Sequence, residues 1–198
     1  MLEARNISFN YPGADAPIYS GLSLAVELGE RVALRAPSGF GKTTLCRLFA
    51  GFEKPTAGEI LLDGAPLPDT GICPVQLIGQ HPELVVDPRM RLGDTLAEAG
   101  GIDKDVLRAL GIKDEWHRRF PHELSGGELQ RFCIARAVAA RPRYLIADEI
   151  STMLDAVTQA QIWSFLLDYV ERGGLGLVFV SHSPALTQRI ATRIVDLS

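Results

Sequence analysis

The segment RAPSGFGKTT, residues 35–44, places a Gly-Phe-Gly sequence directly before a lysine and two threonines. It nearly fits G-x-x-x-x-G-K-[S/T], the pattern of a loop whose backbone N–H groups surround phosphate oxygens. Gly39 and Gly41 allow the tight curl, and the N-terminus of the helix expected after Lys42 favours an anion. Lys42 supplies a charge for β- and γ-phosphates, and Thr43 supplies a hydroxyl for Mg²⁺. The segment therefore predicts a nucleotide cradle, with an ordinary glycine-rich turn as the alternative.

The first position of the pattern is not met, because Ala36 stands where glycine is expected. A negative φ at Ala36 would let alanine fit at little cost, whereas a positive φ would strain the loop by about 1 kcal/mol. Pro37 has no N–H, so the donors to a phosphate must come from later residues of the loop. Since the glycines among those residues are intact, we expect a working cradle.

Three short apolar runs, at residues 31–36, 143–148 and 176–181, each lead into a loop followed by helix-like sequence. This alternation predicts an α/β fold with a mostly parallel core sheet. Helices are expected after Lys42, over 126–140 and over 156–171, the last ended by Gly173 and Gly174.

The remaining segments predict two additions to this core within a single domain, residues 1–198. Strand-like runs separated by turn residues near the N-terminus, together with GEILLDGAPL, predict an antiparallel layer. Residues 82–123 are less sheet-like and predict a small helical insertion, which continues to about residue 140.

The composition excludes several classes of protein. Hydrophobic residues make up 46% and charged residues 22%, as in a globular domain, and the net charge of −4 comes without a basic stripe for nucleic acid. No uncharged run is long and apolar enough to cross a bilayer. Cys46, Cys73 and Cys133 are scattered, which favours reduced thiols over a zinc site or disulfides.

A second segment, LSGGELQR at residues 124–131, opens a predicted helix with small residues. Ser125, Gly126 and Gly127 there offer a hydroxyl and backbone N–H groups that suit an anion. A capping box between Ser125 and Glu128 explains the same letters without any ligand.

Acidic and basic side chains follow two of the predicted core strands. RYLIADE ends in Asp148 and Glu149, a metal-binding carboxylate followed by a candidate base. VFVSHS places His182 at the end of the last core strand, where a packed or solvated histidine is equally common.

Taken in order along essentially all 198 residues, these motifs closely resemble the ATP-binding cassette (ABC) ATPases. The resemblance implies a P-loop NTPase-type fold with a mostly parallel core sheet, an N-terminal antiparallel β subdomain and a helical insertion. It also implies Mg-ATP bound between two subunits, because the signature residues Ser125, Gly126 and Gly127 of this family close over the ATP of the second subunit.

The resemblance further implies roles for individual residues. Tyr11 matches the aromatic residue that stacks on adenine, although a strand-edge tyrosine is the alternative. Gln80 matches the glutamine that touches Mg²⁺ and the attacking water; Gln76 is a poorer candidate because it lies inside the strand-like VQLI. Asp155 matches the aspartate that communicates between subunits, or caps the next helix. The other implied contacts are Ser38, Gly39, Phe40, Gly41, Lys42, Thr43 and Thr44 for phosphate, Thr43, Gln80 and Asp148 for Mg²⁺, Glu149 for polarising the water, and His182 for the γ-phosphate.

Residues 75–96, 120–142 and 148–163 resemble, more narrowly, the peptide/nickel importer group of ABC ATPases. That implies an ATPase on the cytoplasmic face of the cell membrane, driving solute import through permease subunits fed by a solute-binding protein. Its partner ATPase would be identical or different, no nucleic acid is expected, and residues 82–123 would receive a helix of the permease. The chain departs from the group at Ala36, at Ile150, where proline is usual, and at its end at Ser198, because these importers usually continue further.

The alternative from another class is a soluble ABC ATPase of translation or DNA repair. Such proteins carry two cassettes or long coiled-coil or zinc insertions, and this sequence has neither.

Overall fold

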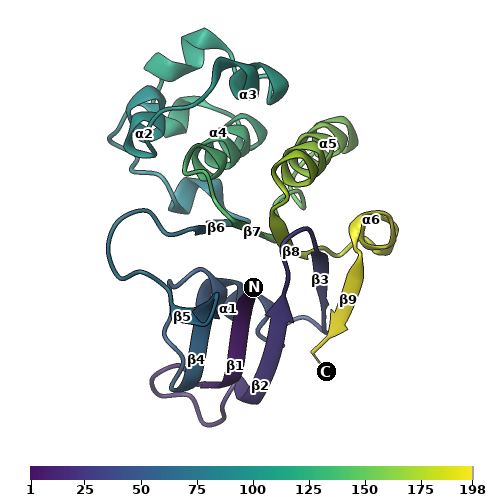
Figure 1. The fold of residues 1–198 in the computed structure, drawn as a ribbon. Coiled ribbons are helices and arrows are strands. Elements are labelled where there is room, and N and C mark those ends of the chain that lie inside the picture. The colour runs from purple at the N-terminus through teal and green to yellow at the C-terminus, as the bar shows by residue number, and fades with distance from the viewer. Residues whose placement is uncertain (198) are drawn as a thin grey trace.

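A five-stranded parallel sheet forms the centre of the computed structural model, which describes residues 1–197 (Figure 1). Its strand order is β6-β7-β8-β3-β9, and every neighbouring pair is parallel. β7 and β8 are buried along their whole length, as expected when helices cover both faces. The strands are β3 (Arg31–Arg35), β6 (Val75–Ile78), β7 (Tyr144–Asp148), β8 (Gly176–Val180) and β9 (Arg193–Asp196).

A second, antiparallel sheet has the order β2-β1-β4-β5, with strands β1 (Leu2–Phe9), β2 (Tyr19–Val26), β4 (Ala57–Leu62) and β5 (Ala65–Pro66). The helix α1 (Lys42–Phe49) lies between the two sheets. Leu2 and Ile7 of the antiparallel sheet share one buried cluster with Leu45 of α1 and Ile146 of β7. This cluster fixes α1 against both sheets.

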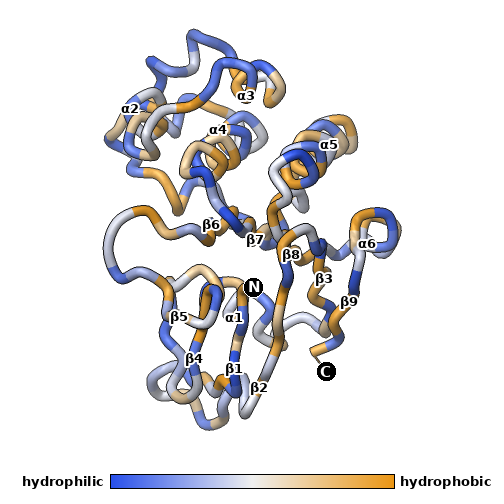
Figure 2. The backbone as a smooth tube through the Cα atoms, viewed as in Figure 1, coloured by the Kyte–Doolittle hydropathy of each residue, from blue (hydrophilic) through white to orange (hydrophobic). Residues whose placement is uncertain are grey.

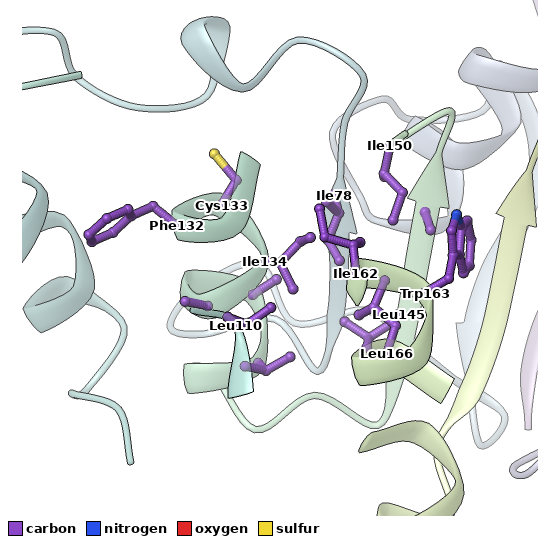
Figure 3. Close-up of a cluster of buried hydrophobic side chains, with 14 of the residues drawn as sticks. Ile78, Leu110, Phe132, Cys133, Ile134, Leu145, Ile150, Ile162, Trp163 and Leu166 are labelled. Atoms are coloured by element: carbon purple, nitrogen blue, oxygen red, sulfur yellow. The ribbon is translucent and has the colours of Figure 1, made fainter. Parts of the chain in front are cut away.

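The opposite face of the parallel sheet carries α4 (Gly126–Ala139), α5 (Ala156–Gly173) and α6 (Pro184–Ile190). Figure 3 shows Ile134 of α4 and Leu166 of α5 directed toward Leu145 of β7. Hydrophobic residues follow β3 and the inner helix faces, whereas the outer loops are largely hydrophilic (Figure 2). Between β6 and α4 lie short helices: η1 (Pro82–Leu84), α2 (Leu92–Glu98), α3 (Lys104–Ala109), η2 (Asp114–Arg118) and η3 (Pro121–Glu123).

The predicted α/β class with a mostly parallel sheet and an antiparallel layer is confirmed. α6 was not predicted, because a helix of seven residues is too short to show a periodic apolar pattern. It starts at Pro184 and is capped by Ser183. β9 is an edge strand that is mostly exposed, so it lacks the apolar run that marked the inner strands. Within residues 1–197, no helix combines the length and the hydropathy that spanning a membrane requires.

Gly58 in β4 provides a test of the antiparallel sheet. Its φ is +77°, and an added Cβ would lie 2.3 Å from the backbone oxygen of Asn6. We expect Gly58→Ala to lower the free energy of unfolding by at least about 2 kcal/mol in urea denaturation, since the backbone must shift. Gly64→Ala is the matched control, because Gly64 has a φ of +79° but no atom within 4 Å of the added Cβ. Equal losses in the two variants would contradict the close approach of β4 to β1.

Candidate nucleotide site

The loop between β3 and α1 has the shape of a phosphate cradle. Gly39 and Gly41 have φ values of +81° and +87°, and Gly41 caps the N-terminus of α1. A Cβ added at Gly41 would lie 2.3 Å from Cγ2 of Ile18, so only glycine fits there. The backbone N–H of Phe40 donates to the oxygen of Pro37 at 3.3 Å and closes the turn.

Ala36 does not strain this loop. Among residues 1–197, the non-glycine residues with positive φ are Asn6, Asp63, Arg141 and Glu149. Ala36 therefore has a negative φ, which alanine adopts without cost. The missing glycine therefore adds no backbone strain to the cradle.

Lys42 is held inside the curl of the loop. Its side chain is buried, and Nζ donates hydrogen bonds to the backbone oxygens of Ala36 at 2.9 Å and Pro37 at 3.0 Å. These carbonyls stabilise the ammonium group close to the N-terminus of α1, where a phosphate would also bind.

Two tyrosines support the start of α1. Tyr19 is buried and donates from Oη to the backbone oxygen of Gly41 at 2.8 Å; burial raises the pKa of this phenol, so it remains a donor. Sequence reasoning missed Tyr19, because nothing in a strand reveals contact with a loop 22 residues later. Tyr11, the expected adenine contact, is 37% exposed, and its Oη lies 3.3 Å from Oγ1 of the buried Thr44.

The three expected Mg²⁺ contacts, Thr43, Gln80 and Asp148, line one cavity. Asp148 is 5% exposed, and its Oδ1 is buried without a hydrogen-bond partner. Burial, reinforced by the charge of Glu149, raises the pKa of Asp148, against the lowering effect of Thr43 and Lys42. A buried carboxylate oxygen without a partner, beside a hydroxyl and an amide, fits a hard cation such as Mg²⁺.

The cavity does not by itself decide between Gln80 and Gln76 as the Mg²⁺ contact, because both residues line it. However, Gln76 already donates from Nε2 to the backbone oxygen of Cys73 at 2.8 Å. Gln130 of α4, which sequence reasoning missed, donates to the backbone oxygen of Gly79 at 3.2 Å and so fixes the chain next to Gln80. The available signal was a glutamine on the buried face of α4.

Glu149 and His182 meet where β7 and β8 end. Oε1 of Glu149 lies 2.8 Å from Nε2 of His182, and the backbone N–H of Glu149 donates to the oxygen of Val180 at 3.2 Å. The φ of Glu149 is +52°, a costly conformation for a non-glycine residue and one that is common at functional sites. The candidate base is therefore held in a fixed place beside the histidine.

The residues of the predicted signature motif, 125–127, lie apart from the expected Mg²⁺ contacts. Ser125, Gly126 and Gly127 line a second cavity together with Asp155, separate from the one around Thr43. The capping box is present, because Ser125 Oγ and Glu128 Oε2 exchange hydrogen bonds with each other's backbone N–H. Asp155 caps α5, accepting from the N–H groups of Val157 and Thr158 at 3.0 Å each.

Comparison with known proteins places this geometry in a family. Residues 19–152 match the family model described as ABC transporter. The chain is 31% identical to the di/tripeptide transport ATP-binding protein DppF of Pseudomonas aeruginosa, covering 98% of this chain and 69% of that protein. It is 35% identical to the nickel import ATP-binding protein NikE of Brucella suis, covering 98% and 82%. For two other peptide-transport relatives, the chain spans 59% and 63% of their length.

A solved structure has the same fold. It is the ATP-binding cassette MJ0796, described as a dimer in a post-hydrolysis state bound to ADP and Pi, with a TM-score of 0.85 and 24% identity over 100% of this chain and 94% of that chain. The chain belongs to the ABC transporter family. This membership confirms the predicted family, and it favours an ATPase of a transporter over an ATPase of translation or DNA repair.

The buried oxygen of Asp148 leads to a prediction about stability. We expect Asp148→Asn to raise the free energy of unfolding of the nucleotide-free protein by about 1 kcal/mol at pH 7, because an amide is cheaper to bury than a carboxylate. Since burial raises the pKa of Asp148, this difference should vanish as the pH falls below the range in which unfolded aspartate ionises.

Thermal unfolding without nucleotide measures the change in stability, and thermal unfolding with Mg-ATP measures whether Asp148 contributes to binding. The variant should gain stability without nucleotide and lose most of the stabilisation that Mg-ATP gives the wild type. A variant that is less stable than the wild type at pH 7, yet equally stabilised by Mg-ATP, would exclude Asp148 as a cation contact.

Proposed function

We propose that this chain is the ATP-hydrolysing subunit of an ABC importer, acting on a peptide-like or nickel-like solute through partner membrane subunits. The observation that carries the proposal is the convergence of Thr43, Gln80 and the unpartnered oxygen of Asp148 in one cavity. The relatives named for dipeptide transport and nickel import support the class of solute.

ATP would bind with its phosphates in the loop from Ser38 to Gly41 and against Lys42, Thr43 and Thr44. Backbone N–H groups at the N-terminus of α1 and the ammonium of Lys42 then face the negative charge. The 37% exposure of Tyr11 leaves its ring accessible to adenine. Thr43, Gln80 and Asp148 would hold Mg²⁺, which supplies neutralisation of the phosphate charge.

Hydrolysis needs a water oriented at the γ-phosphate and little other covalent chemistry. Glu149 would accept a hydrogen bond from that water, and its contact with His182 at 2.8 Å would hold the carboxylate in position. His182 is 54% exposed in its side chain, so it remains accessible to a γ-phosphate.

The role of Glu149 is tested by Glu149→Gln. The amide keeps the size of the carboxylate but loses its basicity, so we expect ATP turnover to fall at least about 100-fold while ATP still binds. Phosphate release by the purified protein measures turnover, and nucleotide titration measures binding. Turnover within threefold of the wild type would refute the assignment.

The separation of the two cavities supports a second ATPase subunit. Because Ser125, Gly126 and Gly127 line a cavity apart from Thr43, they are available to ATP held by another subunit. The dimeric state described for MJ0796 supports this arrangement. Permease subunits would dock at residues 82–123 and hold the pair on the inner face of the membrane, and a solute-binding protein would deliver the solute.

Light scattering on a sizing column tests the pairing, using Glu149→Gln so that ATP is retained. With Mg-ATP we expect the mass to double from the 21.5 kDa of one chain, since the nucleotide links the two subunits. EDTA in place of Mg²⁺ should return the monomer. A monomer that binds Mg-ATP would contradict pairing of identical subunits and assign the second site to a different ATPase chain.

A further inference from the structure

The loop between β7 and α5, residues 149–155, carries Glu149 at one end and Asp155 at the other. Its backbone is strained at Glu149, where φ is +52°. Ile150 follows, and isoleucine does not fix φ as the proline usual at this position does. Contacts from elsewhere must therefore hold the loop in this conformation.

Besides the contacts of Glu149 with Val180 and His182, two contacts from α5 meet at Ser151. Its Oγ accepts hydrogen bonds from Nε2 of Gln159 at 2.9 Å and from Nε1 of Trp163 at 3.0 Å. Ser151 is 7% exposed and Trp163 is 3% exposed, so water cannot replace these bonds easily. Gln159 and Trp163 are four residues apart on α5 and lie on one face of the helix.

Trp163 is itself fixed by packing. The centroid of its ring lies 5.5 Å from the centroid of the Phe179 ring in β8, in an edge-to-face arrangement. Figure 3 shows its indole nitrogen at the same end of the sheet as Ile150, which is also buried. Asp155 anchors the far end of the loop, because it caps the same helix. α5 thus holds both the middle and the end of the loop.

We propose that Trp163 and Gln159 are positioning residues for hydrolysis: through Ser151 they keep the loop in the conformation that places Glu149 beside His182. The inference rests on the proposed function of Glu149. Both side chains bond to Ser151, two residues from Glu149, so their effect on the 2.8 Å contact between Glu149 and His182 would pass through the backbone of the loop.

The simpler reading is a buried hydroxyl that contributes only to folding. A role in folding only and a role in positioning Glu149 predict different kinetics. A role in folding alone lowers the stability and leaves kcat per folded molecule unchanged, whereas misplacing Glu149 lowers kcat and leaves the KM for ATP and the affinity for ATP unchanged.

The test compares Ser151→Ala, Ser151→Thr and Trp163→Phe. We expect Ser151→Ala and Trp163→Phe to lower kcat about tenfold, with the KM for ATP within twofold of the wild type. Ser151→Thr keeps the hydroxyl and should recover most of the turnover. Tyr169→Phe is the matched control, because it removes another hydrogen bond of α5, the 3.1 Å bond from Oη to the oxygen of Val138, away from the loop.

A second readout is independent of turnover. Amide hydrogen exchange of residues 149–155 should be faster in Ser151→Ala and Trp163→Phe than in the wild type and Tyr169→Phe. If the wild type hydrolyses no ATP, the proposed function fails, and the exchange rates alone decide whether α5 holds the loop.

Wild-type kcat and exchange in both Ser151→Ala and Trp163→Phe would overturn the inference. An equal loss of kcat in Tyr169→Phe would also overturn it, because the effect would then be general to α5. If threonine does not fit at residue 151, as thermal unfolding would reveal, the comparison of Trp163→Phe with Tyr169→Phe decides.

Discussion

The register of the parallel sheet is the constraint on which the site depends. Ile78 pairs with Ala147, and Asp148 pairs with Val180, so the chain leaves β6, β7 and β8 at nearly the same level. The carboxyl ends of parallel strands meet at one edge, which is where ligands bind in open α/β sheets. Gln80, Glu149 and His182 follow those ends within two residues. The pairing thus brings Gln80 into one cavity with Asp148 and brings Glu149 beside His182.

Two features at this edge of the sheet lower the stability of the fold. Asp148 belongs to a fully buried strand, yet its Oδ1 has no partner, and Glu149 adopts a positive φ. Both features oppose folding, and the apolar cluster around Leu145 and Phe179 offsets them. Local violations of folding rules in an otherwise consistent domain are expected where a ligand completes the structure. Under the proposed function, bound Mg-ATP would offset both features and stabilise the site.

Much of this could be predicted from the sequence, and the limits have physical causes. The inner strands were predictable because short apolar runs mark them, and the helices α1, α4 and α5 because glycines precede or end them. The exposed edge strand β9 has no such apolar run. Local motifs identified Lys42 and Asp148. Tyr19 and Trp163 were not predicted. Tyr19 bonds to Gly41, 22 residues away, and Trp163 bonds to Ser151, 12 residues away. The spacing of residues in a sequence does not reveal such pairs.

The central claim is that the loop from Ala36 to Thr43 is a working cradle despite its alanine. Calorimetric titration of Mg-ATP into the wild type, Ala36→Gly and Lys42→Ala tests it most directly. The negative φ of Ala36 predicts affinities for the wild type and Ala36→Gly within about threefold of each other, and at least tenfold weaker binding by Lys42→Ala. Binding that appears only after Ala36→Gly, or that survives Lys42→Ala unchanged, would contradict the account.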